Sequence, residues 1–405
     1  MKDILPREME IRDYVISMIK ETYKTFGFCS VETPCVEHID NLVSKQGGEN
    51  EKLIFKILKR GEKLKLDMAQ TEADLADSGL RYDLTLPLAR YYANHVNDLP
   101  SPFKSLQIGN VWRADRPQRG RFRQFMQCDI DILGEPSILA ETELITATTA
   151  LLGKVGFKDF TIRLNDRRIL KAIAAYAGFE EEKFEIIFII LDKLDKIGIQ
   201  GVEDELIKSG FSKDSVEKYL KLYQDMTADH FGLPLLKETL HGILDEKVAD
   251  ELQTIISSVE AVKSADFRII FDPSLVRGMS YYTGPIFEIS MDEFGGSVGG
   301  GGRYDEMIGK FSGIQVPACG FSIGFERIVM LLLENNYKIS TSEIKKAYLI
   351  EKNISEEKMI TIMKKANEER TGGTHVNIII MKKNKKFQKE QLIAEGYTNI
   401  AEFFK

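Results

Sequence analysis

Apolar residues recur at helical spacing near the start of the chain and at strand spacing further on. Residues 10–26 have apolar positions three and four apart, which predicts an amphipathic helix that Gly27 ends. A strand is expected next, in CSVET, before Pro34 stops it. Residues 66–79 are polar and are expected to form a loop. Residues 104–133 contain two apolar segments around a basic turn, with period-2 alternation in places, which is typical of a strand–loop–strand hairpin.

The middle of the chain has a different pattern. Helical periodicity with Lys/Glu faces predicts a helical insertion over residues 166–261. Strand-like segments resume at Phe267, and a helix is expected at 325–334. Residues 1–165 and 262–334 are therefore expected to form one α+β core. Since its strands follow one another in pairs rather than alternating with helices, the sheet is expected to be mainly antiparallel.

A polar linker and a small α/β domain are expected at the end of the chain. Two short strands, at 347–351 and 376–381, flank a helical segment within residues 341–405. This segment has 13 basic and 9 acidic residues, a net charge of +4, whereas the whole chain has −7. The basic balance indicates either a solvated surface or one that contacts nucleic acid.

Composition excludes several classes of protein. Hydrophobic residues make up 43% and charged residues 29% of the chain, which excludes a disordered or collagen-like protein. No run of 18 apolar residues predicts a membrane-spanning helix, and the charged start of the chain does not suggest a signal peptide. The four cysteines are scattered, which favours reduced thiols and a cytoplasmic location. The five histidines are also dispersed, so no protein-bound metal is expected.

An arginine-rich segment, RADRPQRGRFR, carries the first candidate chemistry. It contains five arginines within residues 113–123. The planar guanidinium suits phosphate and carboxylate groups, and the strands on each side would direct several of them at one site. Phe122 and Phe125 could stack on a nucleotide base. The alternative is an exposed basic hairpin without a ligand.

Two further segments contain tyrosine and glycine clusters. In LVRGMSYYTGPIFEI, Arg277 precedes Tyr281 and Tyr282. If these tyrosines lie on a strand, they point to opposite faces, so only one can face a pocket. The six glycines among residues 295–302 would allow a close backbone approach to a ligand, although no Walker A signature follows them. The alternatives are an ordinary strand and a flexible loop.

The remaining candidates are a charged position on an apolar helix and a polar strand. Arg327 lies on the helix that follows ACGFSIG, and a buried arginine is costly without a partner. It could bind a ligand, or it could pair with Glu326 or another carboxylate. Asp83 and Thr85 are two residues apart, so on a strand they would share a face and could hold an ammonium group. The alternative is a surface strand edge.

Taken in this order, the segments resemble histidyl-tRNA synthetases, a family of class II aminoacyl-tRNA synthetases. FCSVETPCVE resembles motif 1, the arginine-rich hairpin resembles motif 2, and GFSIGFERI resembles motif 3. LVRGMSYYTG and GGGGRYD resemble two peptides peculiar to the histidine enzymes. LNDRRIL and LDKLDKIG in the insertion resemble the eukaryotic-like branch. The resemblance extends over residues 3–332.

The resemblance implies a class II core, an antiparallel sheet flanked by helices, in a homodimer. It implies that histidine and ATP, with Mg²⁺ on the phosphates, give histidyl-adenylate, from which histidine passes to tRNA(His). Catalytic roles are implied for Arg113, Arg277 and Arg327. The residues implied for ATP are Arg113, Asp115, Arg121, Phe125 and Arg327. The residues implied for histidine are Asp83, Thr85, Gln127, Asp131, Arg277, Tyr281, Tyr282, Gly301 and Gly302.

Two departures from the family pattern leave alternatives open. Ser280 stands where the family usually has aspartate, and residues 341–405 are shorter than the family's anticodon-binding domain. One alternative is the non-catalytic, histidine-sensing regulatory subunit of ATP phosphoribosyltransferase. Another is an adenylating paralogue with a different role. Retention of all three catalytic arginines favours the synthetase.

Overall fold

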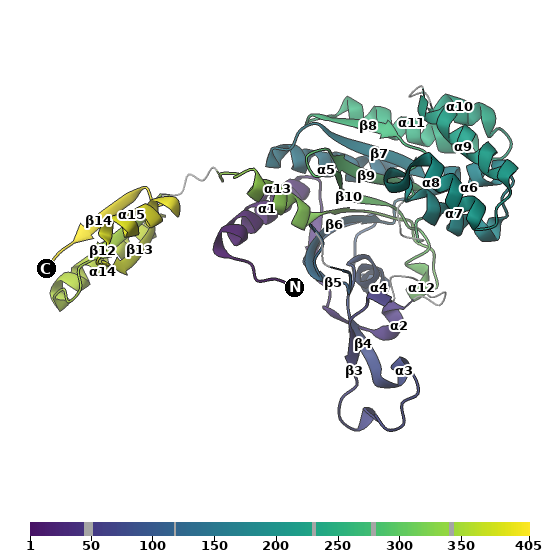
Figure 1. The fold of residues 1–405 in the computed structure, drawn as a ribbon. Helices are drawn as coiled ribbons and strands as arrows, with labels where there is room; N and C mark the ends of the chain where they lie inside the picture. The colour runs from purple at the N-terminus through teal and green to yellow at the C-terminus, as the bar shows by residue number, and fades with distance from the viewer. Residues whose placement is uncertain (44–51, 117–118, 229–231, 277–280, 340–343) are drawn as a thin grey trace. The chain divides into compact units, whose positions relative to one another are not determined.

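An eight-stranded sheet forms the framework of the larger part of the chain (Figure 1). Its strand order is β1-β5-β6-β11-β10-β9-β7-β8. The strands are β1 (Cys29–Val31), β5 (Phe103–Trp112), β6 (Gln124–Leu133), β7 (Phe160–Asp166), β8 (Phe267–Phe271), β9 (Pro285–Met291), β10 (Gly296–Arg303) and β11 (Ala318–Ile323). β1 is parallel to β5 and β7 to β8, whereas all other neighbours are antiparallel. The predicted α+β class with a mainly antiparallel sheet is confirmed.

The computed structural model describes residues 1–43, 52–116, 119–228, 232–276, 281–339 and 344–405. The chain forms two compact units, Met1–Tyr337 and Lys338–Lys405. No helix in the described parts of the chain is both long and apolar enough to cross a membrane.

Three helices cover one face of the large sheet. They are α1 (Pro6–Thr25), α5 (Leu139–Val155) and α13 (Phe325–Glu334). Proline is well tolerated in the first turn of a helix, so α1 begins before the expected residue 10. Successive residues of β6 alternate between the faces, and its apolar residues Cys128, Ile130 and Ile132 are fully buried. The residues between them are polar, so the opposite face of the sheet is the candidate site.

A small antiparallel sheet, ordered β2-β4-β3, adjoins the short helices α2 and α3. Its elements are β2 (Val36–His38), α2 (Ile39–Leu42), β3 (Lys56–Leu58), α3 (Glu72–Leu75) and β4 (Ala76–Leu80). The expectation of a loop over residues 66–79 is therefore wrong for residues 72–79, which belong to α3 and β4. Only the small residues Ala76 and Gly79 of β4 are buried, and its polar residues are partly exposed. Such a short strand has too few apolar positions to produce a clear alternation.

Six helices lie between β7 and β8 in the described part of the chain (Figure 1). They are α6 (Arg167–Ala177), α7 (Phe184–Leu191), α8 (Leu194–Lys208), α9 (Lys213–Ala228), α10 (Gly232–Thr239) and α11 (Glu246–Ala261). Contacts of α9 with α6, α8 and α10, of α7 with α8, and of α10 with α11 join the six helices into one group. The last helix, α11, also packs on α5, β7 and β8, so the group is continuous with the large sheet.

The second unit has its own core. Its parallel sheet is ordered β13-β12-β14. The elements are β12 (Lys345–Ile350), α14 (Glu356–Thr371), β13 (His375–Ile380), α15 (Lys385–Ala394) and β14 (Asn399–Phe403). Tyr348 and Ile350 of β12 pack with α14, while Leu349 packs with Leu392 of α15. Each face of the central strand is thus covered by one helix.

Candidate functional site

Asp83 lies at the edge of the polar face, two residues before the start of helix α4 (Thr85–His95). Its Oδ1 accepts a hydrogen bond from the backbone N–H of Leu86 at 3.1 Å. The expectation that Asp83 and Thr85 share a strand face is wrong, because aspartate before a helical segment favours the helix start. Asp83 is buried, and burial raises the pKa of its carboxyl group although Arg113 opposes this.

Three polar side chains of β6 follow one another on the same face of the sheet. The Nε2 of Gln127 lies 3.4 Å from Oδ2 of Asp129 and 3.2 Å from Oγ of Ser322. The Oδ1 of Asp131 accepts a hydrogen bond from the hydroxyl of Tyr304 at 2.6 Å. Asp129 was not among the residues expected from the sequence. The spacing of two between Gln127, Asp129 and Asp131 on a strand was the signal that could have found it.

Burial and like charge shift the acidity of these carboxyl groups. Burial raises the pKa of Asp131 to about 7, with a further increase from Asp83 and an opposing effect of the Tyr304 hydrogen bond. Burial and the neighbouring Asp131 raise the pKa of Asp129 well above its ordinary value. The site therefore stabilises neutral carboxyl groups or carboxylates that have a cationic partner.

Glycine is required where β10 and β11 pass beneath these side chains. A Cβ on Gly320 would lie 2.0 Å from Oδ1 of Asp131. A Cβ on Gly301 would lie 1.9 Å from the carbonyl oxygen of Gly320, and one on Gly302 would lie 2.9 Å from the Tyr282 ring. The alternative of a flexible loop is wrong, because Gly296–Arg303 forms β10, which lies inside the sheet. A strand of glycines lets neighbouring side chains approach its backbone.

The two neighbouring tyrosines lie together. Their ring centroids are 4.8 Å apart, and the Tyr281 ring is 6.0 Å from that of Tyr304. The expectation that Tyr281 and Tyr282 point to opposite faces is wrong, because both precede β9 and are not in a strand. They join the Tyr304 hydroxyl and Asp131 in one aromatic and acidic group.

Arg113 connects the residues expected for ATP with those expected for histidine. Its Nε donates a hydrogen bond to the carbonyl oxygen of Tyr82 at 2.8 Å, next to Asp83. Its guanidinium carbon lies 5.2 Å from the ring centroid of Phe125, within the range of a cation–π contact. The backbone N–H of Arg113 donates to the carbonyl of Arg123, which continues the β5–β6 hairpin.

Arg327 lies over Phe294, a residue that the sequence did not single out. The guanidinium carbon is 5.2 Å from the ring centroid, and that of Arg119 is 5.6 Å from the same ring. The Nη1 of Arg327 also donates a hydrogen bond to the carbonyl of Ser297. Glu326 instead binds Arg12 of α1, with N–O distances of 2.6 and 2.9 Å. The alternative pairing of Arg327 with Glu326 is thus wrong.

The remaining expected residues are less well defined by contacts. Arg121 is exposed and Asp115 is partly exposed, and the backbone carbonyl of Asp115 accepts a hydrogen bond from Arg123. Arg277 and Ser280 lie outside the described residues. Among the residues that are described, no group of three or more His, Cys, Asp or Glu side chains is placed to hold a metal ion.

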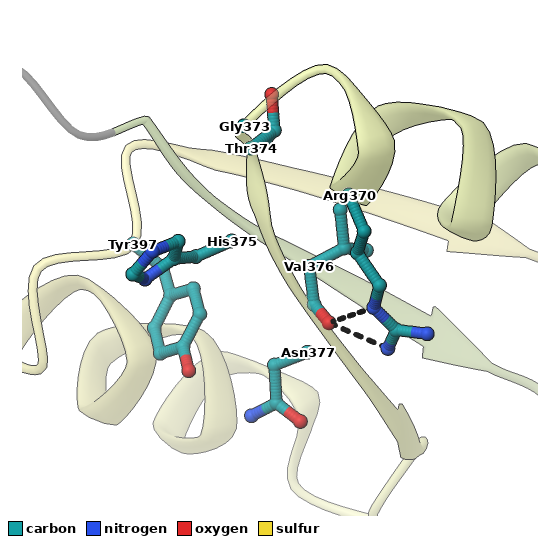
Figure 2. A pocket seen from close by; sticks show the side chains of 7 residues that line it. All are labelled: Arg370, Gly373, Thr374, His375, Val376, Asn377 and Tyr397. Carbon is teal, nitrogen blue, oxygen red and sulfur yellow. Dashed lines mark hydrogen bonds between the residues drawn. The ribbon is translucent and has the colours of Figure 1, made fainter.

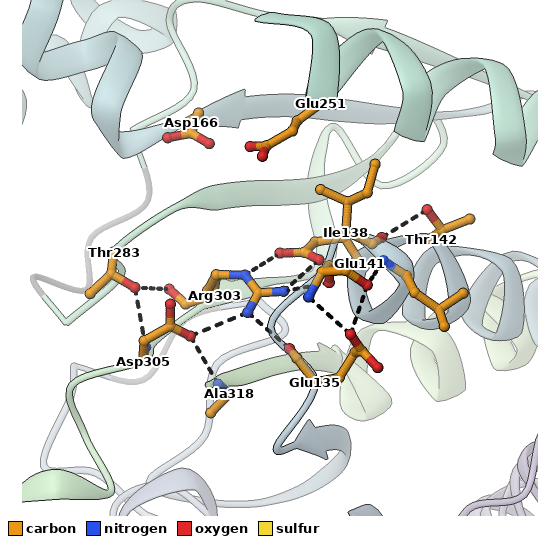
Figure 3. A network of polar contacts seen from close by, with 12 residues as sticks. Glu135, Ile138, Glu141, Thr142, Asp166, Glu251, Thr283, Arg303, Asp305 and Ala318 are labelled. Carbon is orange, nitrogen blue, oxygen red and sulfur yellow. Dashed lines mark hydrogen bonds and ion pairs between the residues drawn. The ribbon is translucent and has the colours of Figure 1, made fainter. Parts of the chain in front are cut away.

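A buried ion pair supports the polar face from the side of α5 (Figure 3). The guanidinium of Arg303 binds Glu141 through two hydrogen bonds of 2.6 and 2.8 Å. Its other donors reach the backbone carbonyls of Glu135 and Ser137 and, at 3.3 Å, Oδ1 of Asp305. The carbonyl of Arg303 accepts the N–H of Thr283, which follows the two tyrosines. The pair therefore connects α5, the end of β10 and the tyrosine segment.

Comparisons with known proteins identify the family. The family model described as "Histidyl-tRNA synthetase" matches residues 1–328. The chain belongs to the histidyl-tRNA synthetase family. It is 48% identical over 341 residues to "Histidine--tRNA ligase" from Leifsonia xyli, covering 82% of this chain and 79% of that protein. The "Histidine--tRNA ligase" of Christiangramia forsetii is 38% identical, and the match covers 82% of this chain and 75% of that protein.

Solved structures of similar fold extend over nearly the whole chain. The histidyl-tRNA synthetase from Nostoc sp. PCC 7120 has a TM-score of 0.78 and 29% identity, covering 98% of this chain and 88% of that one. An "ATP phosphoribosyltransferase regulatory subunit/histidyl-tRNA synthetase" from Bacillus halodurans C has a TM-score of 0.76 but 20% identity, and it supports the fold alone.

The second unit lies beyond the residues matched by the family model, and it contains an open pocket of about 710 Å³. Figure 2 shows its lining residues, which are Arg370, Gly373, Thr374, His375, Val376, Asn377 and Tyr397. The Arg370 guanidinium donates two hydrogen bonds to the carbonyl of Val376. The pocket lies outside the polar face of the large sheet and contains none of the residues expected for ATP or histidine.

Proposed function

We propose that the chain is a histidine–tRNA ligase, an aminoacyl-tRNA synthetase that activates histidine with ATP and transfers it to tRNA(His). The observation that carries the proposal is the group formed by Arg113, Asp83 and Asp131 on the polar face of the sheet. It combines a cation suited to a phosphate with buried carboxyl groups suited to an amino-acid substrate. The names and identities of the relatives support the same activity.

Adenylate formation requires no nucleophilic side chain, because the substrate carboxylate attacks the α-phosphorus of ATP. The protein contributes positioning and stabilisation of developing charge. We assign Arg113 and Arg277 to the α-phosphate, and Arg327 to adenine and the γ-phosphate. Phe125 stacks on the other side of the base, while Arg121 and Asp115 complete the ATP site. ATP is expected to enter with Mg²⁺ on its phosphates, which offsets their charge.

The histidine substrate is expected to lie against the acidic and aromatic group. Asp83, Thr85, Gln127 and Asp131 bind its ammonium group, and the carboxylates supply the opposite charge. Tyr281 and Tyr282 flank the imidazole, and Gly301 and Gly302 leave room beside it. In this assignment, residues 1–165 and 262–334 form the catalytic core and residues 166–261 the insertion. A homodimer in the cytoplasm is proposed on the basis of the family.

ATP–pyrophosphate exchange with each of the twenty amino acids tests the proposal. Exchange is expected with histidine and with no other amino acid, because adenylate formation is reversible and depends on the amino acid bound. Absence of exchange in protein that binds histidine would contradict it. That outcome would favour the regulatory subunit of ATP phosphoribosyltransferase.

The affinity for histidine is expected to decrease as the pH is lowered through the pKa of Asp131, about 7. Below this pH the carboxyl group binds a proton and no longer neutralises the ammonium group, so KM for histidine increases by up to about tenfold per pH unit. Pyrophosphate exchange between pH 6 and 8 measures this.

The variant Asp131→Asn isolates the contribution of this carboxyl group. Its KM for histidine should be high and should depend less on pH than that of the unmodified protein. The titration of histidine itself affects both proteins equally, so the difference between their pH profiles reports on Asp131. Identical pH profiles for the two proteins would exclude Asp131 as the titrating group. KM for ATP serves as the internal reference.

The second unit is proposed to contact tRNA as a shortened anticodon-binding domain. Removal of residues 341–405, which carry a net charge of +4, should weaken tRNA binding and reduce its salt dependence. Filter binding between about 50 and 200 mM salt measures both quantities. Histidine-dependent pyrophosphate exchange should persist, because the first unit is compact without these residues. Full tRNA affinity after truncation would exclude this contact.

A further inference from the structure

Four buried oxygen atoms at the polar face have no hydrogen-bond partner among the residues that the structure describes. They are Oδ2 of Asp83, Oε1 of Gln127, Oδ1 of Asp129 and Oδ2 of Asp131. All four are acceptors, and three belong to carboxyl groups. Because a buried acceptor without a donor is costly, this group suits a ligand that carries several N–H donors.

Asp129 occupies the middle of this group. It lies opposite Ser322 of β11 and Gln107 of β5, and only 4% of it is exposed. The charged groups that act on it are Asp131 on β6, Asp83 before α4 and Arg113 at the end of β5. The Ser322 hydroxyl contributes a hydrogen bond from β11. Among the described residues, one guanidinium faces three carboxyl groups, so a cationic ligand would improve the balance of charge there.

We propose that Asp129 is a further histidine-binding residue, whose Oδ1 accepts a hydrogen bond from a nitrogen of the substrate. This inference rests on the proposed function. Histidine carries three N–H donors on its ammonium group and at least one on its imidazole, which matches the four acceptors. An amino acid with an apolar side chain supplies only the ammonium donors and leaves a buried acceptor unpaired. Asp129 thereby contributes to selection for histidine.

The contact with Gln127 gives Asp129 a second effect. The Gln127 amide directs its Nε2 toward Asp129 and Ser322, which leaves Oε1 as the acceptor for a ligand. A residue that acted only through this contact would position Gln127 without binding the substrate. Direct binding of the substrate and positioning of Gln127 predict different effects of an Asp129 substitution on KM for histidine when the Gln127 side chain is removed.

Asp129→Asn is the first test. KM for histidine in pyrophosphate exchange should rise about 10- to 100-fold, the effect of losing a charge-assisted hydrogen bond, while KM for ATP is unchanged. Asp166→Asn is the matched control, because Asp166 is a buried carboxylate at the end of β7 that binds Arg168. The control is expected to lower the melting temperature and leave KM for histidine unchanged.

The outcomes separate this inference from the proposed function. Absence of histidine exchange in the unmodified protein would contradict the function. An unchanged KM in Asp129→Asn, with the unmodified protein active, would overturn the role of Asp129 alone. If that variant does not fold, Asp129→Ser removes the carboxylate without adding volume and carries the same expectation.

A double-mutant cycle with Gln127→Ala distinguishes binding from positioning. If Asp129 binds histidine, the substitution Asp129→Asn should raise KM for histidine by a similar factor in the Gln127→Ala protein. If the increase disappears in that background, Asp129 acts only through Gln127, and the direct contact is overturned.

Discussion

Replacement of Arg113 by alanine is expected to lower the turnover of histidine-dependent pyrophosphate exchange by about 100- to 1,000-fold. Its guanidinium lies between Phe125 and the segment that carries Asp83, where the α-phosphate and the substrate carboxylate are proposed to meet. Removal of a preorganised donor from a developing oxyanion has an effect of this size. Steady-state exchange rates at saturating ATP and histidine provide the measurement.

Arg268→Ala is the matched control for Arg113→Ala. Arg268 is an exposed arginine on β8, at the far edge of the same sheet, and donates to Thr161. Its removal should leave turnover unchanged. Arg113→Lys should recover little activity, because an ammonium group lacks the planar fork of the guanidinium. Near-normal turnover in Arg113→Ala would remove this residue from the proposed mechanism.

Glu141→Ala is expected to lower the free energy of unfolding by about 3–5 kcal/mol. Glu141 is fully buried and binds Arg303, which is itself buried, through two hydrogen bonds (Figure 3). Loss of the carboxylate leaves the guanidinium charge inside the protein without its main partner. Urea unfolding of the full chain, monitored by circular dichroism, measures the change.

Glu217→Ala is the control for this loss of stability. Glu217 forms an exposed pair with Lys213 one helical turn earlier, and such pairs contribute about 0–1 kcal/mol. Glu141→Gln should have an intermediate effect, because the amide retains one acceptor but loses the charge. A change below about 1 kcal/mol in Glu141→Ala would show that the pair does not support the fold.

The sequence was most informative where one periodicity extends over many residues. The hairpin expected within 104–133 forms two ten-residue strands, and the helix expected at 325–334 has these limits in the structure. The peptides in the arginine-rich hairpin and around Arg327 also indicated the family. In each case, the local pattern and the tertiary environment favour the same conformation.

The wrong expectations concern short segments whose conformation depends on distant contacts. Tyr281 and Tyr282 would alternate if they lay in a strand, but they precede β9, and their rings pack on each other while Tyr281 also packs on Tyr304. The glycines of β10 have no side chains to produce an alternation, so their place in the sheet depends on neighbouring strands. The partner of Glu326, Arg12, is more than 300 positions earlier and has no local signal.

The absence of side chains at Gly302 and Gly320 also affects how the protein can change during evolution. Any amino-acid replacement that starts from a glycine codon introduces a Cβ, and at these positions it would meet Tyr282 or Asp131 at 2.9 Å or less. At these two positions of the backbone beneath the site, even the smallest amino-acid replacement therefore causes a steric clash. A descendant with a different amino-acid preference would have to begin at the surrounding acidic and aromatic side chains.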